Sequence, residues 1–210
     1  MIVIENGNVI KKMFNNELDF YTELNFYEQF SDFLYIPKLI KTEDMILFLE
    51  YINGEIILNT SNEVKPLLGK TLAKFHNLTY NNDTNLSLIH SDNNLKNYIY
   101  ANQQFYMIDF SDISMGNPLS DLYSVLIFLC EQLKKADFYK VSNEMIDTYY
   151  NNINFNIELN NELLQTEINR FEERREKLGK CIYNYDKYLI NKAILFETEK
   201  RTNISIDKNT

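Results

Sequence analysis

The sequence lacks an excess of positive charge. Its 21 Lys and Arg residues are outnumbered by 30 Asp and Glu residues, so the 210-residue chain has a net charge of −9. Proteins that bind duplex DNA or an anionic membrane usually present a basic face, because they must neutralise phosphate groups. We therefore expect neither nucleic acid nor a membrane as a partner. A cationic small molecule would suit this charge better.

Cysteine and long apolar runs are also scarce. The two cysteines, Cys130 and Cys181, are far apart in apolar surroundings, and neither belongs to a Cys-x-x-Cys pair. A zinc site is therefore not expected, and buried thiols in a reducing compartment are the simpler interpretation. The longest apolar run, SVLIFLC, is too short to cross a bilayer, and the N-terminus lacks the pattern of a signal peptide. We expect a cytoplasmic protein.

Hydrophobic residues make up 45% of the chain, which is enough for one domain or for two lobes that share an interface. Near the N-terminus, two β-prone runs flank Asn6 and Gly7, a strong hairpin signal because both residues tolerate positive φ. Residues 15–33 follow with apolar side chains at three- and four-residue spacing, Leu18 and Tyr21 among them. This spacing predicts a helix.

Residues 38–51 are predicted to form two strands around a Thr-Glu-Asp turn, and helices dominate afterwards. Residues 61–78 form the first of these helices. Their spacing places Leu68, Leu72 and Phe75 on one helical face.

Further elements are predicted toward the C-terminus. Residues 104–110 indicate a short strand, and residues 118–135 indicate a helix that is apolar nearly all round and hence buried. Residues 161–200 carry a helical stripe, either as one helix or as two helices broken near Gly179. Residues 201–210 are predicted to be a frayed tail.

The order of these elements favours an α+β fold with two unequal lobes. Residues 1–52 would form a small β-rich lobe with one helix, and residues 53–200 a larger helical lobe. A cleft between unequal lobes is a usual place for a nucleotide.

The segment HSDNNLKN concentrates polar side chains between two apolar runs. His90, Asp92 and Asn97 form the pattern His-x-Asp-x-x-x-x-Asn, and Asp109 follows at the end of a short apolar strand. Carboxylate and amide oxygens are ligands that Mg²⁺ prefers, with waters or phosphates at its other positions. Phosphoryl transfer needs this metal against ATP, and a carboxylate that receives the proton of the attacking hydroxyl. The pattern therefore favours phosphoryl transfer.

These motifs resemble those of the protein-kinase-like phosphotransferases, and within them the aminoglycoside phosphotransferase and choline kinase branch. HSDNNLKN is similar to the H-G-D-x-x-x-x-N loop of that branch, MIDFSD to its metal-binding I-D-[FW]-[DE] segment, and GNPLSDLYSVL to its G-D-P-x-x-D-L-A segment. The resemblance runs over residues 8–128 and is strongest over 88–126. It implies a bilobal protein-kinase-like fold, ATP and Mg²⁺ as cofactors, and transfer of the γ-phosphate to a hydroxyl group of a small molecule.

The resemblance also implies roles for the matching residues. Asp92 would be the catalytic base, or the group that orients the substrate hydroxyl, and Asn97 and Asp109 would hold magnesium. His90 would support the backbone of the loop. Asp121 would accept hydrogen bonds from that backbone at the start of a buried helix, although an acid there also suits the helix dipole.

In this family a strand lysine contacts the α and β phosphates and pairs with a glutamate of the following helix. Lys11 is the favoured match, and Lys12 is an equal candidate on spacing alone. Only one of the two can face the cleft, because side chains alternate along a strand. Glu23 would be the ion-pair partner, with Glu17 and Glu28 as alternatives.

The segment FLEYINGE resembles the hinge of these enzymes, where the backbones of Glu50 and Ile52 would bind adenine beside Leu49. The sequence departs from the family pattern because it has no glycine-rich loop over the phosphates. The small lobe is therefore expected to be truncated, and a partner protein could complete it.

Two positions in the catalytic loop keep the type of substrate open. Ser91 stands where this branch usually has Gly, and Asn94 stands where protein kinases carry Lys and this branch often carries His. Two alternatives to a small-molecule kinase therefore remain. One is a minimal protein kinase or ATPase similar to the kinase of the tRNA-modification KEOPS complex, and the other is a pseudokinase that acts as a binding module.

Overall fold

The computed structural model describes residues 2–5, 8–179, 190–191 and 193–194. They fall into two compact units. The described residues within 1–60 and 90–114 make up the first, the N-terminal unit, and those within 61–89 and 115–210 make up the second, the helical unit. This division differs from the boundary predicted at residue 52, because the polar segment that begins at His90 belongs to the N-terminal unit.

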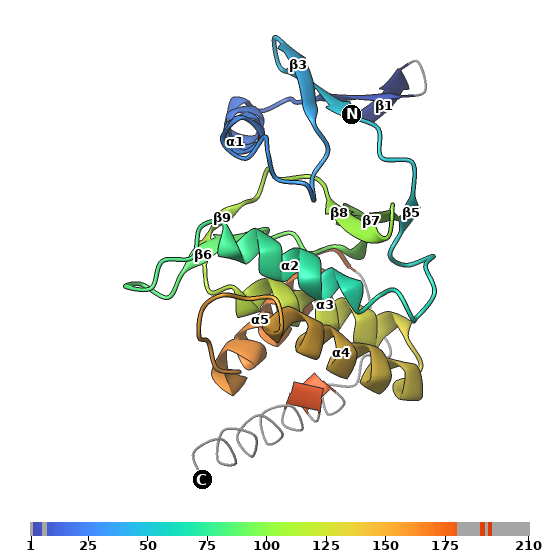
Figure 1. Cartoon of the computed structure of the whole chain (residues 1–210), viewed down its shortest axis with the longest axis vertical. Coiled ribbons are helices and arrows are strands. Elements are labelled where there is room, and N and C mark those ends of the chain that lie inside the picture. Colours follow the sequence, from blue (N-terminus) through green and yellow to red (C-terminus); the bar gives the residue numbers. More distant parts are fainter. Residues whose placement is uncertain (1, 6–7, 180–189, 192, 195–210) are drawn as a thin grey trace. The chain divides into compact units, whose positions relative to one another are not determined.

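A four-stranded antiparallel sheet forms much of the N-terminal unit. Its strands have the order β1-β2-β4-β3 and are β1 (Ile2–Glu5), β2 (Val9–Met13), β3 (Leu39–Glu43) and β4 (Ile46–Glu50) (Figure 1). The antiparallel pairing of β1 with β2 confirms the predicted hairpin, whose turn residues Asn6 and Gly7 lie outside the described residues. The two strands predicted within residues 38–51 are confirmed as well, and Asp44 in their turn has a φ of 50°.

Helix α1 (Glu17–Gln29) lies beside this sheet (Figure 1). It begins after Asn16, whose side chain accepts a hydrogen bond from the Leu18 N–H at 2.8 Å. The helix confirms the prediction. Of the apolar residues whose spacing predicted it, Leu18 and Tyr21 are 72% and 54% exposed. The side chains that α1 buries are Phe20, Glu23, Phe26 and Tyr27. Aromatic residues occur on several sides of this helix, so apolar spacing alone could not select the inner face.

A second, smaller sheet supports the polar segment. Its strands have the order β5-β7-β8 and are β5 (Glu55–Ile56), β7 (Tyr98–Ala101) and β8 (Gln104–Met107). A 3-10 helix, η1 (Leu95–Asn97), leads directly into β7, and Asp109 comes shortly after β8. Glycine is required at Gly54, because a Cβ there would lie 2.3 Å from the carbonyl oxygen of Tyr100.

Helices form most of the helical unit. They are α2 (Leu67–Asn77), α3 (Leu119–Gln132), α4 (Lys135–Tyr150) and α5 (Asn161–Lys177), and two short strands, β6 (Ser87–Ile89) and β9 (Ser114–Gly116), pair with each other (Figure 1). Leu68, Leu72 and Phe75 on α2 are fully buried, as predicted. Helix α3 buries side chains on nearly every side, which also agrees with its apolar sequence.

The structure adds one helix, α4, that the sequence analysis did not predict. It packs closely on α2, where a Cβ at Gly69 would lie 2.3 Å from the Met145 carbonyl oxygen. Helix α5 ends close to Gly179, which has a φ of +61°, at the predicted break. Of the predicted continuation to residue 200 only four residues are described, and the predicted tail, 201–210, lies outside the described residues.

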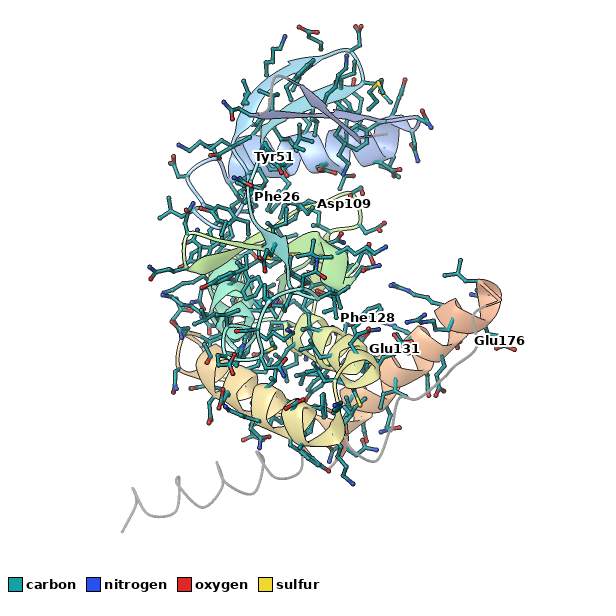
Figure 2. All side chains as sticks on the ribbon, turned by 90° about the vertical axis from the view of Figure 1, so that its right-hand side faces the viewer. Phe26, Tyr51, Asp109, Phe128, Glu131 and Glu176 are labelled. Atoms are coloured by element: carbon teal, nitrogen blue, oxygen red, sulfur yellow. The ribbon has the colours of Figure 1, made fainter. Side chains whose placement is uncertain are left out.

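Helices α3 and α5 are joined by aromatic and charged side chains. Figure 2 shows Phe128 and Glu131 on the α3 side of this contact. The Phe128 ring meets Phe171 edge-on with centroids 5.1 Å apart, and Arg175 forms an ion pair with Glu131.

Cys130 on α3 is buried, and Cys181 lies outside the described residues. Within the described part of the chain, no helix is both long and apolar enough to cross a membrane.

Candidate active site

A lysine and two carboxylates meet beside the four-stranded sheet. The Lys12 ammonium on β2 lies 2.5 Å from Glu23 Oε2 on α1 and 2.5 Å from Asp109 Oδ1. The side chains of Lys12 and Glu23 are 13% and 0% exposed, whereas that of Asp109 is 41% exposed. One largely buried cation thus joins β2, α1 and the segment that follows β8.

The ion-pair partner of Glu23 is Lys12, not Lys11, which was the residue favoured from the sequence. Successive strand side chains point to opposite faces, and the face that carries Lys12 is the one that meets α1. Lys11 lies instead over an aromatic ring of β4, with Nζ 5.6 Å from the ring centroid. Of the three glutamates weighed on α1, Glu23 is buried, whereas Glu17 and Glu28 are exposed.

The environment shifts the pKa values of these groups in different directions. Burial raises the pKa of Glu23 to about 7, although the Lys12 ammonium and the Phe110 N–H favour the charged form. Burial also opposes ionisation of Asp109, but Lys12 and the Ser111 hydroxyl outweigh it and hold the pKa of Asp109 below its ordinary value. Burial would lower the pKa of Lys12, yet the two carboxylates raise it. At neutral pH, Lys12 is therefore a cation beside an anionic Asp109.

The polar segment predicted to be a catalytic loop is held by its own hydrogen bonds. His90 Nε2 donates to the Ile108 carbonyl at 2.9 Å, and the Asp92 N–H donates to the His90 carbonyl at 2.8 Å. Asn97 Nδ2 donates to the carbonyl oxygen of Asp92 at 2.9 Å and to its Oδ2 at 3.1 Å. These bonds fix the Asp92 carboxylate. They also turn the Asn97 amide nitrogen toward Asp92, so the amide oxygen is the atom left for a cation.

Another pair of side chains, which the motifs did not indicate, supports this loop. The Tyr98 hydroxyl donates to Asn93 Oδ1 at 2.5 Å, and the two residues are 0% and 2% exposed. Asn is frequent throughout this chain, and Asn93 is one of several Asn residues in this loop. Residue type therefore gave no signal, because the burial of Asn93 depends on where Tyr98 lies in three dimensions.

Asn97 and Asp109 lie on neighbouring segments, since the Ile108 N–H donates to the Asn97 carbonyl at 3.0 Å. Asp109 has a φ of 69°, and its Oδ1 accepts a hydrogen bond from Ser111 Oγ at 3.1 Å. One carboxylate and one amide oxygen suit Mg²⁺, which takes few protein ligands and keeps waters or phosphates at its other positions. In the described ranges, no group of three or more His, Cys, Asp or Glu side chains could hold a metal ion.

Phe110 anchors the segment that carries Asp109. Its fully buried ring stacks on Phe26 of α1 with centroids 4.0 Å apart, and it meets Tyr27 edge-on at 5.7 Å. The His90 ring lies 5.1 Å away on the loop side. Phe26 and Asp109 are both marked in Figure 2. The position of Asp109 is therefore set by aromatic packing.

Comparison of the whole structure with known proteins identifies the fold. No family model and no curated protein sequence matches the chain. Among solved structures, an aminoglycoside-3'-phosphotransferase of type VIII matches with a TM-score of 0.60 and 12% identity, over 79% of this chain and 85% of that one. The streptomycin–ATP complex of APH(2'')-IIa matches with a TM-score of 0.55 and 18% identity, over 71% and 74%. Choline kinase LicA from Streptococcus pneumoniae matches with a TM-score of 0.54 and 14% identity, over 92% and 87%.

The chain has the fold of the aminoglycoside phosphotransferases and choline kinases. The α+β, protein-kinase-like fold predicted from the sequence is thereby confirmed.

In the helical unit of this kinase-like fold, Asp121 belongs to a buried polar network. Its Oδ2 accepts a hydrogen bond from His76 Nε2 at 3.1 Å, and His76 Nδ1 lies 2.9 Å from the Tyr149 hydroxyl. All three residues are fully buried, on α3, α2 and α4 respectively. The predicted contact of Asp121 with the catalytic-loop backbone stays a prediction. The sequence pointed to Asp121 but not to this network, because the network depends on how three helices pack.

The predicted hinge of the kinase-like fold follows β4. The Glu50 N–H donates to the Lys38 carbonyl at 2.9 Å, and the Tyr51 N–H donates to the Asn8 carbonyl at 2.9 Å (Tyr51 is marked in Figure 2). The N–H of Glu50 is thus bonded within the protein, and the role of Glu50 in adenine binding stays a prediction. Ile52 is buried, at 8% exposure. Its role in adenine binding stays a prediction.

Proposed function

We propose that the protein is an ATP- and Mg²⁺-dependent phosphotransferase that moves the γ-phosphate of ATP to a hydroxyl group of a small molecule. The observation that carries this proposal is the arrangement of Lys12, Glu23 and Asp109 beside the hydrogen-bonded pair of Asp92 and Asn97. It brings together a cation for phosphates, two oxygen ligands for a metal, and a fixed carboxylate. Phosphoryl transfer needs these groups, because its catalysis consists mainly of positioning and charge stabilisation.

Each residue has a distinct task in this proposal. Lys12, held by Glu23, would contact the α and β phosphates of ATP. Asn97 and Asp109 would hold the Mg²⁺ ion, which neutralises charge on the phosphates. Asp92 would accept a hydrogen bond from the acceptor hydroxyl and take its proton as the hydroxyl attacks. The double hydrogen bond from Asn97 holds Asp92 in place for this step.

Two observations favour a small-molecule acceptor over a protein. The matching structures contain or are named for aminoglycosides and choline. In addition, only the short segment Phe110–Pro118 separates Asp109 from α3, whereas protein kinases place a regulatory activation loop after the corresponding aspartate. The net charge of −9 further favours a cationic acceptor over an anionic one.

Binding of Mg-ATP gives a direct test. A ligand at about 100 times its Kd stabilises the native state by about 2.7 kcal/mol, which for a protein of this size raises Tm by about 5–11 °C. We expect such a rise with millimolar Mg-ATP, and ADP release when aminoglycosides, choline, sugars and nucleosides are screened as acceptors. If millimolar Mg-ATP causes no thermal shift, the phosphotransferase proposal is wrong and the pseudokinase alternative is favoured.

A further inference from the structure

The Lys12 ammonium does more in this structure than pair with the glutamate of α1. It lies 2.5 Å from Asp109 Oδ1, the carboxylate proposed to hold magnesium, and the Ser111 hydroxyl bonds to the same oxygen at 3.1 Å. A protein cation therefore already neutralises the metal-binding carboxylate.

We propose that Lys12 competes with free divalent cations for Asp109, so that the metal site opens only when the phosphates of a nucleotide draw Lys12 away. This inference rests on the proposed function, because it assigns Asp109 to the metal and Lys12 to the phosphates. It assigns the chain a binding order: nucleotide and metal enter together, and free metal binds poorly.

The burial of the two carboxylates explains why Lys12 can exchange one of them. Glu23 is 0% exposed, and a buried carboxylate cannot lose its cation without a large penalty. Asp109 is 41% exposed, so solvent or an incoming cation can replace the ammonium there. We therefore expect Lys12 to keep its contact with Glu23 and to lose its contact with Asp109 when a nucleotide binds.

The charge balance supports the same order of binding. Without nucleotide, the Lys12 ammonium already lies beside the Asp109 carboxylate, and a divalent cation on Asp109 would come close to that ammonium. This like-charge repulsion weakens metal binding. With ATP present, the phosphates supply new negative charge for Lys12, and the metal can then take Asp109 together with the Asn97 oxygen and phosphate oxygens.

The size of the effect can be judged from proton binding. A neighbouring opposite charge changes the proton affinity of a carboxylate by roughly 10- to 1000-fold. A divalent cation experiences the same field with twice the charge. Removal of the Lys12 charge should therefore raise the affinity of the nucleotide-free protein for a divalent cation by at least about tenfold.

The test uses Mn²⁺ alone as the probe, measured by electron paramagnetic resonance or calorimetry on the full chain without nucleotide. Lys12→Met should bind Mn²⁺ at least about tenfold more tightly than the wild type, while it binds ATP more weakly. Lys12→Arg keeps the charge and should show no gain in Mn²⁺ affinity. Lys11→Met is the matched control, because Lys11 lies on the other face of the same strand, and it should leave both affinities unchanged.

Adding Asp109→Asn to Lys12→Met should abolish the gain, which would locate the Mn²⁺ ion at Asp109. Equal Mn²⁺ affinity in the wild type and Lys12→Met, or a gain that survives Asp109→Asn, would overturn the inference. Circular dichroism of each variant separates these outcomes from unfolding.

The experiments distinguish failure of this inference from failure of the proposed function. A Mn²⁺ gain in Lys12→Met without any Mg-ATP stabilisation of the wild type would support the competition and refute phosphoryl transfer.

Discussion

Replacing Glu23 by Gln should change how the stability of the protein depends on pH. Burial raises the pKa of Glu23 in the folded protein to about 7 from an ordinary value of 4.5. A carboxyl group whose pKa is raised by folding stabilises the folded state fully below pH 4.5, and this contribution is lost as the pH rises through about 7. The shift corresponds to about 3 kcal/mol in all, since one pKa unit equals 1.36 kcal/mol. About 2 kcal/mol of it falls between pH 5 and pH 7.5.

The assay is urea unfolding of the wild type and Glu23→Gln at a series of pH values. The wild type should lose about 2 kcal/mol of unfolding free energy relative to Glu23→Gln between pH 5 and pH 7.5. Asp109 does not obscure this window. Its pKa is lowered from an ordinary value of 3.8, so the stability that it contributes is present above that pH and is lost only as the pH falls below it. Glu28→Gln, an exposed change on the same helix, should follow the wild-type curve. Parallel curves for wild type and Glu23→Gln would refute the reasoning.

Two further predictions concern packing in the helical unit, both measured as unfolding free energies. Tyr149→Phe removes the hydroxyl that lies 2.9 Å from His76 Nδ1 and should cost about 1–3 kcal/mol, whereas Tyr21→Phe, at an exposed position, should be neutral. Gly69→Ala should destabilise the protein by about 1–3 kcal/mol, because the new Cβ would meet the Met145 carbonyl oxygen, although alanine itself favours helices. A stabilised variant would show that α2 and α4 can move apart without cost.

Motifs that resemble those of a known family were enough to predict the fold. The distances between Asp92, Asn97, Asp109 and Asp121 matched a known family pattern, and the structure brings Asp92, Asn97 and Asp109 onto bonded, adjacent segments. These motifs can be recognised from the sequence because each one lies within a few consecutive residues.

The choice between Lys11 and Lys12 could not be made in the same way. Both residues lie in one strand, and a shift of one residue exchanges the two faces of a strand. Only the position of α1 decides which lysine meets Glu23. The buried face of α1 could not be predicted for a related reason, since it depends on what the helix packs against. Leu18 and Tyr21, which follow the helical spacing, are exposed.

Helix α4 shows another limit of the prediction. Its buried side chains Phe138, Val141, Met145 and Tyr149 do follow helical spacing, but charged and polar residues between them obscure the stripe. The hydrogen bond between His76 and Asp121 could not be predicted from any local pattern, because it joins residues on different helices.

Turnover by an Asp92→Ala variant tests the central claim most directly. Formation of ADP should be measured for wild type and variant with an acceptor found by screening, and ATP affinity should be measured in parallel. The account predicts that turnover falls by about 10²- to 10⁴-fold, the usual contribution of a positioned base, while ATP affinity changes little. Undiminished turnover in Asp92→Ala would contradict it.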